Sequence, residues 1–104
     1  MKTSGAKDLR SDRRTNTRDK IRKVGRIVIG EPQKVVSCII LDLSGSGALL
    51  LVHDKVPETF ALYHKSERTL RDVRVTRRQN DTIGVQFVGD PVPRTDARFE
   101  LLRD

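Results

Sequence analysis

Six short runs rich in Val, Ile and Leu, separated by clusters of Gly, Pro, Asn and Asp, constrain the fold of this chain most strongly. β-Branched residues favour strands, and the turn residues mark where each strand ends. Six short antiparallel strands at this spacing predict an all-β fold that closes into a small barrel, because closure removes the exposed edges of an open sheet. The runs span residues 24–29, 34–43, 48–52, 59–63, 70–78 and 82–88.

A short helix is expected after the last strand, beyond the Pro-containing loop at 89–93. Thr95 or Asp96 can cap its first turn. Ala97, Phe99 and Leu102 are then spaced to pack inward. With 104 residues the chain has the length of one small domain.

The net charge of +7 is confined to the N-terminal quarter. Residues 1–26 hold ten Lys and Arg against three Asp, whereas the remainder of the chain is neutral. We therefore predict a flexible basic arm at 1–23, followed by the barrel and helix at 24–104. Arginines recur there at every fourth position, where like charges in a helix would repel each other. An arm that becomes ordered around an anion fits this pattern better than a free helix.

The break between the second and third runs, Asp42-Leu43-Ser44-Gly45-Ser46-Gly47, combines a carboxylate, hydroxyls and glycine backbone. We call residues 43–47, which follow Asp42, the Gly-rich turn. Its ordinary interpretation is an Asx-type turn with a Gly at positive φ. Its functional interpretation is a small polar site at the edge of a sheet.

The catalytic signatures searched for do not occur. His53 and His64 fall in expected loop or strand-end positions, without metal-ligand spacing around them. Asp42 stands where a nucleophile elbow requires Gly, and phosphate-binding Gly-rich motifs are missing. We expect a binding domain and not an enzyme, with no metal or cofactor. The lone Cys38 and the lack of a long apolar run predict a buried thiol in a cytoplasmic protein without membrane insertion.

Two motifs occur in order: Arg14 and Arg18 form Arg-x3-Arg, and after 23 intervening residues Asp42 opens Asp-x-Ser-x-x-Gly. With the closing run Ile83-Gly84-Val85-Gln86-Phe87, the chain resembles the PilZ family over residues 13–89. The resemblance implies a bacterial cytoplasmic receptor for cyclic di-GMP, which it binds without turnover.

The resemblance also implies roles for single residues. Arg14 and Arg18 would bind guanine N7 and O6 with their guanidinium forks, and pair with the phosphates. Arg13, directly before the motif, is associated in the family with binding of two stacked ligands instead of one. Arg18 and Arg22 form a second Arg-x3-Arg pair, so the register of the motif stays open.

On the barrel, Asp42 would accept hydrogen bonds from the guanine edge or from an arginine of the arm. Ser44 would contact the base edge, and Gly47 would let the backbone approach closely. We expect residues 19–23 to act as a hinge and the arm to order over the Gly-rich turn, which would signal to a partner protein.

Two other functions stay open. The basic arm of a small barrel could bind RNA or single-stranded DNA, although the few aromatic residues leave little to stack on bases. The chain could also act purely as a protein-interaction module of the same family.

Overall fold

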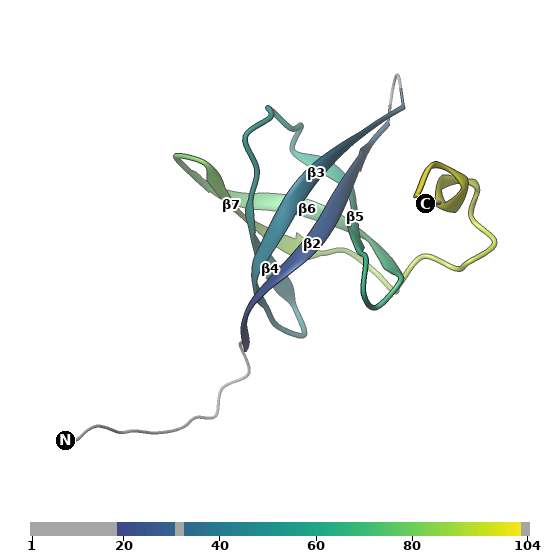
Figure 1. The fold of residues 1–104 in the computed structure, drawn as a ribbon, viewed down its shortest axis with the longest axis horizontal. Helices are drawn as coiled ribbons and strands as arrows, with labels where there is room; N and C mark the ends of the chain where they lie inside the picture. The colour runs from purple at the N-terminus through teal and green to yellow at the C-terminus, as the bar shows by residue number, and fades with distance from the viewer. Residues whose placement is uncertain (1–18, 31–32, 103–104) are drawn as a thin grey trace.

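Six antiparallel strands close into a barrel in the computed structural model, which describes residues 19–30 and 33–102 (Figure 1). Around the barrel the order is β2-β3-β4-β7-β6-β5, and β5 returns to pair with β2. The predicted antiparallel barrel with a short C-terminal helix is confirmed. The strands are β2 (Asp19–Ile29), β3 (Lys34–Leu43), β4 (Gly47–Leu51), β5 (Thr59–His64), β6 (Thr69–Gln79) and β7 (Thr82–Phe87), followed by the 3-10 helix η1 (Ala97–Leu102).

The barrel interior is filled by alternate residues of each strand, as the two-residue period of a pleated strand requires. On β3, for example, Val36, Cys38 and Ile40 are buried while their neighbours are more exposed. Ile27 and Leu50 are completely buried. Each large apolar side chain buried in this way stabilises the fold by about 1.5–3 kcal/mol.

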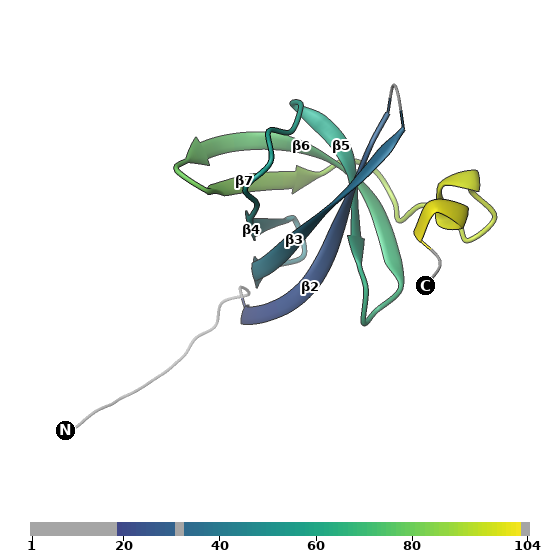
Figure 2. The same ribbon diagram turned by 45° about the horizontal axis from the view of Figure 1, so that its top comes forward.

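A second apolar cluster lies outside the barrel and fixes η1 beside β5 (Figures 1 and 2). Leu102 is buried in this cluster, and the Phe99 and Tyr63 rings form a T-shaped pair with 6.3 Å between their centroids. Asp96 caps the helix by accepting from the Arg98 backbone N–H at 2.9 Å. Ala97, expected to pack inward, is exposed, because a six-residue 3-10 helix has room for little more than one apolar contact face.

The first strand is longer than predicted. β2 begins at Asp19, which pairs with Leu43, so the expected hinge at residues 19–23 is wrong. β3 offers a backbone partner along its whole length, and a bulge between Lys20 and Lys23 absorbs the irregular register of the polar segment. Residues 1–18, which make up most of the predicted arm, lie outside the described part of the chain.

Candidate functional site

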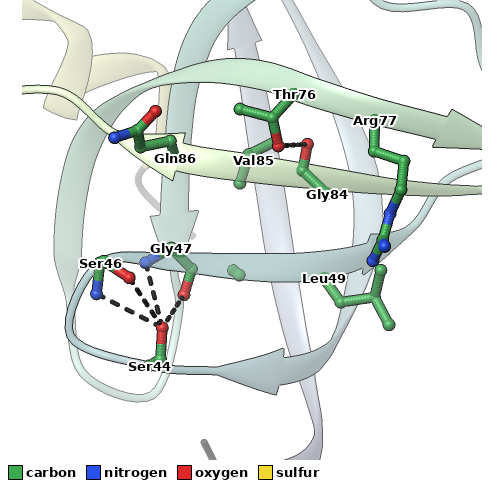
Figure 3. Close-up of a pocket in the computed structure, with 10 residues that line it drawn as sticks. Ser44, Ser46, Gly47, Leu49, Thr76, Arg77, Gly84, Val85 and Gln86 are labelled. Carbon is green, nitrogen blue, oxygen red and sulfur yellow. Dashed lines mark hydrogen bonds between the residues drawn. The ribbon is translucent and has the colours of Figure 1, made fainter.

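The Gly-rich turn connects β3 to β4, and the Ser44 hydroxyl holds it together (Figure 3). Ser44 Oγ accepts from the backbone N–H groups of Ser46 and Gly47 at 3.3 and 3.2 Å. The Ser44 N–H also donates to the Gly47 carbonyl at 2.9 Å. A hydroxyl that bonds backbone N–H groups two and three residues ahead is a local turn device. Ser44 therefore shapes the turn from within.

Gly47 is required by the packing of two strands. A Cβ at this position would collide with the carbonyl oxygen of Val85 on β7. Gly47 pairs with Gln86 across the β4–β7 ladder. Among the glycines of the described residues, positive φ occurs at Gly89 alone, so the ordinary turn with a Gly at positive φ does not occur here. A side chain is excluded at Gly47 because β4 approaches β7 closely, and not because the backbone is left-handed.

Asp42 lies on β3 just before the turn and is 7% exposed. It is the one polar or charged residue that is buried in the described part of the chain. Its backbone register is with Lys20 on β2 and Leu49 on β4. A carboxylate is costly to bury in apolar surroundings. Asp42 therefore places a carboxyl group behind the turn, at the end of the barrel where β2 starts.

A cavity of about 460 Å³ opens on the β4–β7–β6 side of the turn, and we call it the turn pocket. Backbone of Gly47 and Gly84, which lack side chains, contributes to its lining, and Figure 3 shows polar groups from β6 and β7 around it. Its lining residues are Ser44, Ser46, Gly47, Ala48, Leu49, Thr76, Arg77, Gly84, Val85 and Gln86.

A bulge in β6 gives the turn pocket its cation. Consecutive residues of a regular strand point to opposite faces, yet Thr76 and Arg77 both line this cavity. The β6–β7 register shifts between Val75 and Arg77, which is where such a re-orientation is expected. Thr76 Oγ1 is held by donation to the Gly84 carbonyl at 3.2 Å. The pocket thus offers a guanidinium, an amide and hydroxyls, which suit a polar anionic ligand.

A smaller cavity of about 280 Å³ lies on the other side of the turn, at the barrel mouth, and we call it the mouth pocket. Ser44 and Gly45 line it together with Arg71 and Phe87. The Arg71 guanidinium stacks on the Phe87 ring at 4.3 Å and donates to the Gly89 carbonyl at 2.8 Å. These contacts fix Arg71 next to the turn.

The two histidines lie in separate surroundings. The side chain of His53 is 78% exposed and lies 3.5 Å from Asp81. His64 Nε2 lies 3.1 Å from the Ser66 hydroxyl, and desolvation lowers the pKa of its ring below 6.5. The described residues contain no group of three His, Cys, Asp or Glu that could hold a metal ion. No helix in residues 19–30 and 33–102 is long and apolar enough to cross a membrane.

The structure brings together part of the predicted site. Ser44 and Gly47 line the turn pocket, and Asp42 lies directly before the turn. Arg22 lines a different cavity, beside the β5–β6 turn. Arg13, Arg14 and Arg18 fall outside the described residues.

Sequence reasoning missed Thr76, Arg77 and Gln86 as lining residues. The charge alternation of residues 70–78 indicated an exposed strand face, but the bulge that turns Arg77 into the pocket leaves no clear pattern in the sequence.

Comparison with protein-family models gives a match to the PilZ domain over residues 12–98. This match includes the Arg-x3-Arg segment, all six strands and the first part of η1. Neither the curated proteins nor the solved structures gave a match.

Proposed function

We propose, since this chain belongs to the PilZ domain family, that it is a non-enzymatic receptor for cyclic di-GMP that binds at the turn pocket. PilZ domains typically bind this dinucleotide, and the family is one of non-catalytic receptors. Arg14 and Arg18 would complete the site from the N-terminal side. The bound arm would then present a changed surface to a partner protein in a bacterial cytoplasm.

The pairing of Asp19 with Leu43 carries the proposal. Arg18 directly precedes Asp19 in the sequence, and Arg14 lies four residues earlier. β2 begins at the end of the barrel that carries the Gly-rich turn. The segment that holds the Arg-x3-Arg motif therefore joins the barrel at that end, although the two motifs are far apart in sequence.

The chemistry of the turn pocket suits part of a guanine dinucleotide. Its volume of about 460 Å³ falls in the range of small-molecule sites. Arg77 offers a fork for phosphate or for guanine N7 and O6, and Gln86 an amide for the base edge. Arg14 and Arg18 would add two positive charges over the same surface. Together these cations match a ligand with two phosphates.

The geometry supports revised roles for the barrel residues. Because Asp42 is only 7% exposed, we propose that its carboxyl group orients an arginine of the arm and does not contact guanine directly. Ser44, whose hydroxyl bonds the turn backbone, would hold the N–H and carbonyl groups of the turn in place. Gly47 would contribute backbone that lies open to the ligand.

The location of Arg22 favours Arg14 and Arg18 as the working pair. Arg22 lines a separate cavity with residues of the β5–β6 turn. A working pair of Arg18 and Arg22 would leave one of its two arginines at a cavity other than the turn pocket. Arg13 would then favour binding of two stacked ligands, as the family resemblance implies.

Binding of RNA or single-stranded DNA is not favoured by the aromatic residues. Phe60 and Tyr63 are buried, Phe87 lies under Arg71, and Phe99 packs on Tyr63. Each aromatic ring of the described residues is therefore engaged in packing, and stacking platforms for bases are absent from this part of the chain.

Isothermal titration calorimetry with cyclic di-GMP tests the proposal, with cyclic di-AMP as the matched ligand that lacks the guanine edge. Arg14→Ala and Arg18→Ala should each weaken binding about ten- to a hundredfold, as expected for loss of a bidentate contact. Arg22→Ala removes the same charge from the neighbouring cavity and should leave the affinity nearly unchanged. Arg77→Gln should weaken binding without changing the fold. No heat at tens of micromolar ligand, or an equal loss in Arg22→Ala, would refute the proposed site.

A further inference from the structure

A third cavity, of about 440 Å³, lies where β2 passes the turn between β5 and β6. Four cations from two elements line it: Arg22 and Lys23 from β2, and Lys65 and Arg68 from the turn. All four side chains are exposed, and among the residues that the structure describes no Asp or Glu lines the cavity. We call it the basic pocket. Four like charges around one concavity produce a positive potential that favours an anionic occupant.

The β5–β6 turn separates its charges between two cavities. Lys65 and Arg68 line the basic pocket, whereas Glu67 lines the mouth pocket. The Lys65 N–H donates to the Val24 carbonyl at 3.3 Å, which joins this turn to β2. The cations of the two elements are therefore held as neighbours by backbone contacts, and the negative charge of the turn is directed elsewhere.

Arg68 occupies a backbone conformation that an arginine adopts at a cost. Its φ is 54°, in the left-handed region that Gly and Asn normally fill in such turns. Its N–H donates to the Lys65 carbonyl at 3.2 Å, which closes the turn. Residues strained in this way concentrate at functional sites. The turn geometry would be served better by glycine, so we ascribe the arginine to the charge that it brings to the pocket.

The pocket also has an apolar side, which favours an acidic peptide over a nucleic acid as its occupant. Val24, which lines it, is 51% exposed. Tyr63, the one aromatic residue in the lining, is 8% exposed and meets the edge of Phe99. A single-stranded nucleic acid gains affinity by stacking its bases on exposed aromatic rings. A peptide that combines carboxylates with an aliphatic side chain matches both the cations and Val24.

We propose that the basic pocket docks an acidic segment of a partner protein, with carboxylates on the four cations and an aliphatic side chain against Val24. This surface is distinct from the turn pocket, and the proposal does not depend on cyclic di-GMP binding. Arg22 and Lys23 lie on the same strand as Asp19, from which the arm extends. A ligand held by the arm would therefore act close to the docking surface.

Fluorescence polarisation with the full chain tests the proposal, using a labelled peptide of sequence EELEELEE and its counterpart QQLQQLQQ. Lys23→Gln/Arg68→Gly removes two charges from the pocket, whereas Lys34→Gln/Lys55→Gln removes two from exposed positions outside it. The pocket variant should bind the acidic peptide at least about tenfold more weakly, and the control variant should bind like the original chain. Arg68→Gly alone should unfold at or above the original temperature, because glycine relieves the left-handed φ.

Four outcomes would overturn the proposal. The first two are an equal loss of affinity in the two double variants and equal binding of the neutral and the acidic peptide. The third is a marked fall in the unfolding temperature of Arg68→Gly. The fourth is a labelled oligothymidylate that binds more tightly than the acidic peptide and whose binding is weakened only in the pocket variant. The last result would assign the pocket to nucleic acid. Oligothymidylate binding that is the same in both variants would place that interaction outside the pocket and support the assignment to protein.

Discussion

Gly47 and Gly84 lie near each other on neighbouring strands, and the same substitution should affect the two in opposite directions. A Cβ at Gly47 would collide with the Val85 carbonyl, a backbone group that can move only if the β4–β7 ladder moves. A Cβ at Gly84 would meet its nearest neighbour, Arg77 Cβ, at 3.7 Å, an ordinary van der Waals contact. Gly84→Ala is therefore a matched control for Gly47→Ala.

The expected magnitudes follow from these two environments. Forcing a methyl group against fixed backbone costs about 1–3 kcal/mol. Replacing a strand glycine where there is room restricts the unfolded chain and stabilises by about 0.4–1 kcal/mol. For a domain of this size, 1 kcal/mol corresponds to about 4–8 °C in the midpoint of thermal unfolding. Gly47→Ala should thus unfold well below the original protein and Gly84→Ala at or slightly above it.

Urea and thermal unfolding followed by far-ultraviolet circular dichroism measure both changes, since the chain has no Trp. If Gly47→Ala retained the original stability and lost only ligand binding, the strand-packing explanation would be wrong and the glycine would serve the ligand. Destabilisation of both variants to the same extent would refute the steric distinction between the two positions.

Three further predictions concern the turn, the helix and the thiol. Ser44→Ala removes an acceptor that bonds two N–H groups of the Gly-rich turn, so it should lower the free energy of unfolding by about 1 kcal/mol in a urea titration. Hydrogen bonds from Arg98 lower the pKa of Asp96 from 3.8 to about 2. Because the folded-state pKa is depressed, the ionised carboxylate stabilises the fold above about pH 4, and this contribution is lost as the pH falls through about 2. Asp96→Asn should flatten the acid limb of a stability–pH profile; an unchanged limb would contradict this. Burial raises the pKa of Cys38 to about 12, so a disulfide reagent at pH 8 should modify it rapidly in urea and very slowly in the native protein.

If both proposals hold, β2 links two binding surfaces. Its first residue, Asp19, pairs beside the Gly-rich turn, and Arg22 and Lys23 line the basic pocket a few residues later. The bulge between Lys20 and Lys23 lies between these points. A bulge is a local irregularity that can re-aim the residues beside it. Cyclic di-GMP should then change the affinity for the acidic peptide, and unchanged affinity would show that the two surfaces are independent.

Apolar periodicity predicted most of the fold. It located β3 at residues 34–43 and the β6–β7 hairpin within a residue at each end, since buried strands alternate with the pleat and turn residues mark their ends. It failed at the start of β2, where four of the five residues 19–23 are charged. A strand segment that is held mainly by backbone pairing with β3 leaves no apolar pattern in the sequence.

The sequence by itself determined the barrel, the Gly-rich turn and the excess of positive charge in residues 1–26, because periodicity, turn chemistry and charge are local properties of a chain. Only the tertiary structure decided that the Val85 carbonyl leaves no room for a side chain at residue 47. It also decided that a bulge brings Arg77 to the turn pocket and that Arg22 lines another cavity. These features depend on which strands become neighbours when the barrel closes and on how their registers shift. Both are set by contacts between residues distant in sequence.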